Sequence, residues 1–113
     1  MYSQAMIDGI SARFKALAEP MRIRVLQVLR GGERSVSELM EAVGANQANL
    51  SKHLGVLHRE GLVSRRKDGL RVYYRIADPT VFRICEAVCG SIGARATRQA
   101  KALRADGVGR RAR

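Results

Sequence analysis

Apolar residues recur at helical spacing over the first third of the chain. Residues 4–18 carry most of their apolar side chains near one face, which predicts an amphipathic helix. A second helix is expected to start at Pro20, because proline suits the first helical turn, and to end at Gly31. Its apolar residues lie nearly all round the helix, so we expect it at the centre of the fold.

The next stretch predicts two short helices joined by a tight connection. Ser35 and Glu38 form a Ser-x-x-Glu capping box, so a third helix is expected to start there. Gly44 can adopt the left-handed conformation that ends a helix, and Asn46 is a good N-cap for a fourth one. The fourth helix is expected to end at Gly61 and to bury three leucines at i, i+4 and i+7 spacing: Leu50, Leu54 and Leu57.

Two short runs after the fourth helix have the pattern of paired β-strands. They cover residues 62–67 and 70–76, and Asp68-Gly69 stands between them. An Asp-Gly pair between such runs is a strong signal for a hairpin turn. A capped helix, a turn, a polar-faced helix and a basic hairpin form the plan of a winged helix-turn-helix, which places one helix in the DNA major groove.

A fifth helix and a tail are expected after the hairpin. Asp78 suits an N-cap and Pro79 the first helical position, and apolar residues continue to Ile92. Beyond about residue 104 the chain is mostly Gly, Ala and Arg, a composition typical of disorder. The predicted fold class is mainly α with a small β-hairpin wing (α+β), with about five helices in one DNA-binding and dimerisation domain over residues 1–104 and a basic tail over residues 105–113.

The charge balance favours a polyanionic partner. The 113 residues include 21 Lys and Arg against 10 Asp and Glu, a formal net charge of +11. Residues 95–113 hold seven basic residues and one acidic residue, so the rest of the chain is basic as well. Such an excess in a small domain points to nucleic acid. The alternative at this point is a solvated surface followed by a basic tail.

The fourth helix and the hairpin carry the side chains expected to contact double-stranded DNA. Gln47 and Asn49 suit adenine and Ser51 suits several bases, whereas Lys52 and His53 are expected to contact phosphates. The basic side chains of the hairpin would hold the DNA backbone or enter the adjacent minor groove. The predicted set is Asn46, Gln47, Asn49, Ser51, Lys52 and His53 on the helix, and Arg65, Arg66, Lys67 and Arg71 on the hairpin.

Residues 12–92 resemble the ArsR/SmtB family of bacterial winged-helix repressors. The resemblance is carried by three segments: residues 14–24 (FKALAEPMRIR), 45–54 (ANQANLSKHL) and 69–76 (GLRVYYRI). It implies a homodimer joined by the first and last helices, a palindromic operator and release of the operator when an inducer binds. Two-fold symmetry also follows from physics, because two half-sites one helical turn apart restore the specificity that one module lacks.

The inducer sites expected from the resemblance are mostly missing. Ser35 and Ser37 stand where some relatives carry Cys-x-Cys, the last helix has no His, and Gln27 stands where a persulfide-sensing branch has a cysteine. What remains is Cys85-x-x-x-Cys89, whose thiols share one helical face. No cofactor is expected to be required, but arsenite, Cd²⁺, Zn²⁺ or a reactive sulfur or oxidant could react there. Core packing is the alternative role of these cysteines.

Other classes of function fit the sequence less well. We find no arrangement of nucleophile, base or paired carboxylates, so we do not expect an enzyme. The sequence shows neither a secretory signal nor a run long enough to span a bilayer, so we expect a cytoplasmic protein with no membrane partner. Two alternatives stay open: a winged-helix regulator with no inducer at the cysteines, and a non-specific, nucleoid-type DNA binder.

Overall fold

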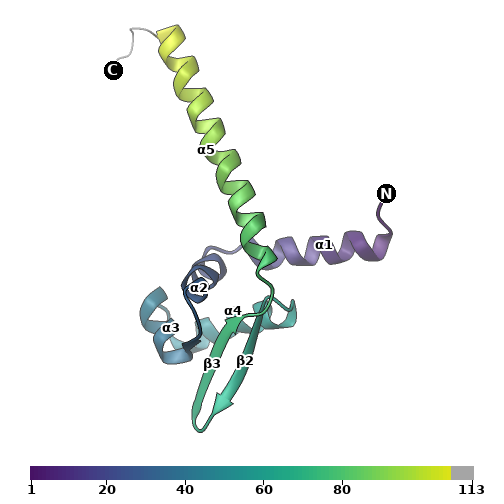
Figure 1. The fold of residues 1–113 in the computed structure, drawn as a ribbon, viewed down its shortest axis with the longest axis vertical. Coiled ribbons are helices and arrows are strands. Elements are labelled where there is room, and N and C mark those ends of the chain that lie inside the picture. The colour runs from purple at the N-terminus through teal and green to yellow at the C-terminus, as the bar shows by residue number, and fades with distance from the viewer. Residues whose placement is uncertain (108–113) are drawn as a thin grey trace. The chain divides into compact units, whose positions relative to one another are not determined.

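A computed structural model describes residues 1–107 and divides the chain into two compact units, Met1–Pro79 and the segment that starts at Thr80. The first unit contains four helices and three strands, and the second is one helix (Figure 1). No helix in the described part is long and apolar enough to cross a membrane. The elements are α1 (Gln4–Leu17), α2 (Pro20–Arg30), β1 (Arg34–Ser35), α3 (Val36–Val43), α4 (Gln47–Arg59), β2 (Val63–Asp68), β3 (Arg71–Ile76) and α5 (Thr80–Gly107).

The predicted caps of α3 and α4 are confirmed. The backbone N–H of Glu38 donates to Ser35 Oγ at 3.1 Å, and the Ser35 N–H donates to Glu38 Oε1 at 2.8 Å, which completes the capping box. Gly44 ends α3 with a φ of 68°, a left-handed conformation that favours glycine. Asn46 caps α4 by accepting from the Asn49 N–H at 2.8 Å. The left-handed backbone of Gly44 and the side-chain cap of Asn46 therefore define the two ends of the short connection between the helices.

The hairpin belongs to a three-stranded antiparallel sheet with the order β1-β3-β2. β2 and β3 pair residue for residue from Val63–Ile76 to Asp68–Arg71, so the loop is Gly69-Leu70, one residue later than the sequence suggested. Gly69 has a φ of 64°, and no non-glycine residue in the described chain has a positive φ. A two-residue loop with glycine first and a negative φ second fits a type II′ turn, whose twist matches the strands.

The core of the first unit is made of aliphatic side chains from every helix and from the base of the hairpin. α2 contacts α1, α3, α4 and β3, which confirms its expected central position. The largest fully buried side chains of this unit are Val25, Leu26, Leu29, Leu39, Leu50, Leu54, Leu57, Leu62 and Val63. Burying a leucine of this kind is worth roughly 1.5–3 kcal/mol, so these contacts hold α4 and the wing against α2 and α3.

The fifth helix starts at Thr80 and runs to Gly107. Asp78, expected as its N-cap, accepts a hydrogen bond from Arg13 at 3.0 Å, an ion pair within the first unit. The predicted disordered tail, residues 105–113, overlaps the end of this helix, and residues 108–113 lie outside the described part of the chain. Disorder of the tail therefore stays a prediction.

Candidate DNA-binding surface

The N-terminal half of α4 presents most of the polar side chains expected to read DNA. Gln47, Ser51 and Lys52 are exposed, and Asn49 is half-buried. Asn46 is exposed at the start of the helix, where its side-chain oxygen is used by the cap and its amide N–H₂ group stays available to donate. The leucine face of the helix is buried, so these side chains are held on a rigid support.

His53 was expected on this polar face, and that placement is wrong. His53 is buried, with 5% of the residue exposed, and its Nδ1 accepts a hydrogen bond from Arg22 Nε at 3.0 Å. Burial lowers the pKa of the His53 imidazole, and the nearby charges of Arg22 and Lys52 lower it further. Its spacing explains the error, because residue 53 stands three after Leu50 and four before Leu57, on the buried stripe.

The wing presents exposed cations on both of its faces. Side chains alternate along a strand, so Arg65 and Lys67 share one face of β2, and Arg66 lies on the other. Arg71 is exposed at the tip of the wing, where it is the strand partner of Asp68 in the last residue pair before the loop. A concavity of about 370 Å³ is lined by Arg65, Arg66, Lys67 and Val72. Three cations around one hollow suit the phosphates of a DNA strand.

Arg66 is already engaged by protein groups that the sequence did not point to. Its Nε and Nη2 donate to the two carboxylate oxygens of Glu33 at 2.9 and 2.8 Å, a bidentate ion pair. Its guanidinium carbon lies 4.4 Å from the centre of the Tyr73 ring. The hydrogen bonds from Arg66 hold the pKa of the Glu33 carboxyl below its usual value. Arg66 therefore joins the wing to the loop before β1, and its charge is partly neutralised.

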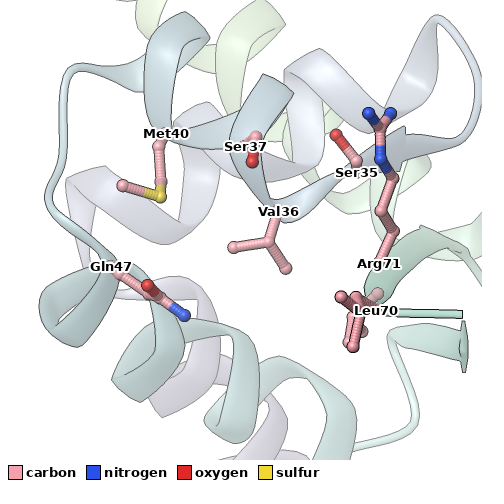
Figure 2. Close-up of a pocket in the computed structure, with 8 residues that line it drawn as sticks. Ser35, Val36, Ser37, Met40, Gln47, Leu70 and Arg71 are labelled. Carbon is pink, nitrogen blue, oxygen red and sulfur yellow. The ribbon is translucent and has the colours of Figure 1, made fainter.

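A groove between the helices and the wing brings two predicted contacts to one place. It has a volume of about 160 Å³, with Gln47 from α4 and Arg71 from the wing among its lining residues. Figure 2 shows Met40 and Gln47 on one side, Leu70 and Arg71 on the other, and Val36 between them. The start of α4 and the tip of the wing therefore border a common space.

The two cysteines lie on α5, in the second unit. Cys85 is half-buried, Cys89 is exposed, and both are free thiols. Among residues 1–107 no three His, Cys, Asp or Glu side chains are grouped so that they could hold a metal ion. The described part of one chain therefore offers at most the two thiolates at this place.

Comparison with known proteins settles the family. A profile described as "Bacterial regulatory protein, arsR family" matches residues 19–65. The crystal structure of Rv0081 from Mycobacterium tuberculosis matches with a TM-score of 0.71 at 40% identity, over 86% of this chain and 97% of that one. The chain belongs to the ArsR family. The resemblance seen in the sequence is thereby confirmed, and so is the winged helix-turn-helix fold.

Two further relatives connect this ArsR chain to named regulators. A probable mercury resistance operon repressor of Streptomyces lividans is 43% identical over 74 residues, which is 66% of this chain and 59% of that protein. The solution structure of Mb0332 from Mycobacterium bovis, described as a homodimeric winged helix-turn-helix DNA-binding domain, has a TM-score of 0.70 at 36% identity and covers 82% of this chain and 91% of that one.

The alignments with two of these relatives cover only part of each protein. The sequence of Rv0081, named as an uncharacterized HTH-type transcriptional regulator, is 49% identical over 69 residues. The aligned segment spans 60% of that protein and 59% of the mercury repressor. These relatives are named as transcriptional regulators or repressors, which agrees with the prediction that the ArsR chain is not an enzyme.

Proposed function

We propose that this ArsR protein is a transcriptional repressor that binds double-stranded DNA through α4 and the wing. The observation that carries the proposal is the capped N-terminal half of α4, where Gln47, Ser51 and Lys52 are exposed beside a basic hairpin. A helix with free amide and hydroxyl groups can read base edges in the major groove. The cations of the wing would then bind the flanking backbone.

Selection from a randomised duplex library tests this proposal. An enriched, palindromic sequence is expected, and Gln47→Ala should weaken its binding by about 1–3 kcal/mol. Gln27→Ala is the matched control, because Gln27 is an exposed glutamine on α2. Lys67→Ala should weaken binding to all duplexes by a similar factor. It should also reduce the slope of the logarithm of the binding constant against the logarithm of the salt concentration by about one. A library with no enriched sequence would instead favour the non-specific, nucleoid-type alternative.

We also propose that the repressor is a homodimer. Large apolar side chains stay exposed on α1 and α5 in the single chain: Phe14 is 53% exposed, Ile92 64% and Leu103 71%. Burial between two copies would remove these surfaces from water. The homodimeric relative Mb0332 supports this assembly. Sedimentation of Phe14→Glu should give a lighter species than the parent, whereas Leu70→Glu, at the tip of the wing, should leave the mass unchanged.

The inducer is proposed to react with Cys85 and Cys89. The two thiols are one helical turn apart, and thiolates prefer thiophilic species such as arsenite, Hg²⁺ or Cd²⁺. The relative named for mercury resistance supports this class of ligand. A site with three or four thiolates would need two chains. An inducer that binds more tightly to the dimer geometry unsuited to DNA weakens DNA binding. The coupling free energy is reciprocal, so DNA weakens inducer binding by the same amount.

Fluorescence anisotropy on the selected duplex tests the inducer site. One equivalent of arsenite or Hg²⁺ per chain should release the reduced parent protein from DNA but not the Cys85→Ser/Cys89→Ser variant. Reactive sulfur or peroxide treatment covers the redox alternative in the same assay. Equal responses of parent and variant to every reagent would leave a DNA-binding regulator with no inducer at these cysteines.

A further inference from the structure

One guanidinium group connects three helices of the first unit. Arg22 on α2 donates from Nη1 to the carbonyl oxygens of Lys15 at 3.2 Å and Ala16 at 3.3 Å, near the end of α1. Its Nε donates to His53 Nδ1 on α4 at 3.0 Å. Carbonyl groups in the last turn of a helix lack partners within that helix. Arg22 therefore adds two hydrogen bonds at the end of α1, where the Lys15 carbonyl also accepts from the Ala18 N–H at 3.2 Å. At the same time it holds the helix proposed to read DNA.

The hydrogen bond to His53 depends on the protonation state of the ring. Arginine can only donate, so Nδ1 must carry a lone pair, and the proton of the neutral ring is on Nε2. A protonated ring has a donor on both nitrogens and cannot accept from Arg22. It would also place a second positive charge against the guanidinium. Protonation of Nδ1 therefore breaks the hydrogen bond from Arg22 and places two positive charges next to each other.

The groups around His53 disfavour a positive charge on its ring. The residue is 5% exposed and shares the buried stripe of α4 with Leu50, Leu54 and Leu57. The charged groups that act on it are Arg22 on α2, Lys52 on α4 and Glu19 just before α2. Two of these three are positive. Burial and these charges together hold the pKa of His53 below its ordinary value of 6.5.

We propose that Arg22 and His53 are positioning residues whose hydrogen bond sets the place of α4 for sequence reading, so that protonation of His53 lowers operator selectivity. The inference rests on the proposed DNA-binding function. His53 touches no DNA in this scheme. It acts through its neighbours Ser51 and Lys52, which move with the backbone of α4 when the contact to α2 is lost.

Selectivity, and not affinity alone, is the quantity to measure. Protonation adds a positive charge, which raises binding to any duplex. The ratio of affinities for the selected duplex and a random duplex cancels this effect. Because the pKa of His53 lies below 6.5, the fall in this ratio is expected below that pH. At fixed salt, the ratio should fall about tenfold between the neutral and the protonated ring, the order of effect expected for a hydrogen bond with a charged donor.

Two substitutions separate His53 from other titrating groups. His53→Asn keeps an oxygen that can accept from Arg22 but cannot titrate in this range, so it should retain the selectivity at neutral pH and lose the fall at acid pH. His58→Asn is the matched control, because His58 is an exposed histidine on the same helix. It should respond to pH as the parent does. Equal pH responses in the parent and His53→Asn would overturn the proposal.

A second measurement does not require any variant to fold. The chain contains only two histidines, so the ring signals of His53 can be followed by NMR through a pH titration. By reciprocity, the pKa of His53 should be lower in the complex with the selected duplex than in the complex with a random duplex. Equal or reversed values would refute the link. Failure to enrich any duplex would instead count against the proposed function itself.

Discussion

Asn46 offers the sharpest test of how local structure supports DNA reading. It was predicted both as the N-cap of α4 and as a DNA contact. Its Oδ1 accepts from the Asn49 N–H at 2.8 Å with an extended backbone (φ −78°, ψ 167°), the geometry of an N-cap. Asn46→Ala removes the acceptor and leaves the first turn of α4, which carries Gln47 and Asn49, with one more unpaired N–H.

The expected loss of stability follows from that one contact. An N-cap replaced by alanine costs about 1 kcal/mol, and because the site is exposed no buried group adds to the loss. For a chain of 113 residues, between the size classes of small and medium domains, that corresponds to a decrease in Tm of about 4 °C. Asn46→Ser should keep the stability of the parent. Asn46→Asp should match or exceed it by about 0.3–1 kcal/mol, because a negative charge is favourable at the start of a helix.

The same variants should rank differently in DNA binding. Far-ultraviolet circular dichroism at one fixed protein concentration gives Tm, and anisotropy on the selected duplex gives Kd. Asn46→Asp should be stable but bind weakly, because its carboxylate repels phosphates. If Asn46→Ser keeps both quantities, Asn46 is only a cap; if it keeps stability but loses affinity, the Asn46 amide contacts DNA. An Asn46→Ala variant as stable as the parent would refute the capping argument.

Three further predictions concern the core, the turn and the ion pair of the wing. Leu57→Ala should lose roughly 2–5 kcal/mol of unfolding free energy in urea, whereas Leu70→Ala, at a fully exposed site, should change it by less than about 0.5 kcal/mol; similar losses would contradict the core assignment. Gly69→Ala meets no atom within 4 Å, so only the left-handed φ of 64° opposes it, and a loss of about 1 kcal/mol with faster amide exchange in the wing is expected. Because Arg66 lowers the pKa of Glu33, this ion pair stabilises the fold above about pH 4.5 and loses its effect as pH falls through the lowered pKa. Denaturation of the parent and Glu33→Gln across that range should therefore converge at acid pH, and parallel curves would disprove the assignment.

Features that depend on a few neighbouring residues could be predicted from the sequence. The capping box of Ser35, the left-handed Gly44 and the cap at Asn46 each follow from rules that span at most four positions. The hairpin was placed correctly to within one residue. Its turn was misplaced because Asp68-Gly69 favours a turn with both residues at positive φ, whereas the pairing of Asp68 with Arg71 moves the loop to the next position.

Two features of the site were missed, for two different reasons. His53 was assigned to the DNA-facing side of α4 because it is polar. Its spacing relative to Leu50 and Leu57 already placed it on the buried stripe. The ion pair of Glu33 with Arg66 joins residues 33 positions apart in the chain, and no local pattern indicates it. Arg66 looks like any other cation of the wing until the register places Tyr73 opposite it.

The unbroken pairing of β2 with β3 restricts how the wing can change in evolution. All six residues of β2 have a partner on β3, and the loop between them has only two residues. A residue pair added at the tip would lengthen the wing by about 3.3 Å without disturbing the pairs below it. A single residue inserted within β2 would slip that strand and exchange the faces of the β2 residues on one side of the insertion, which can separate Arg66 from Tyr73. The paired part of wings descended from this one should therefore change in length by whole residue pairs.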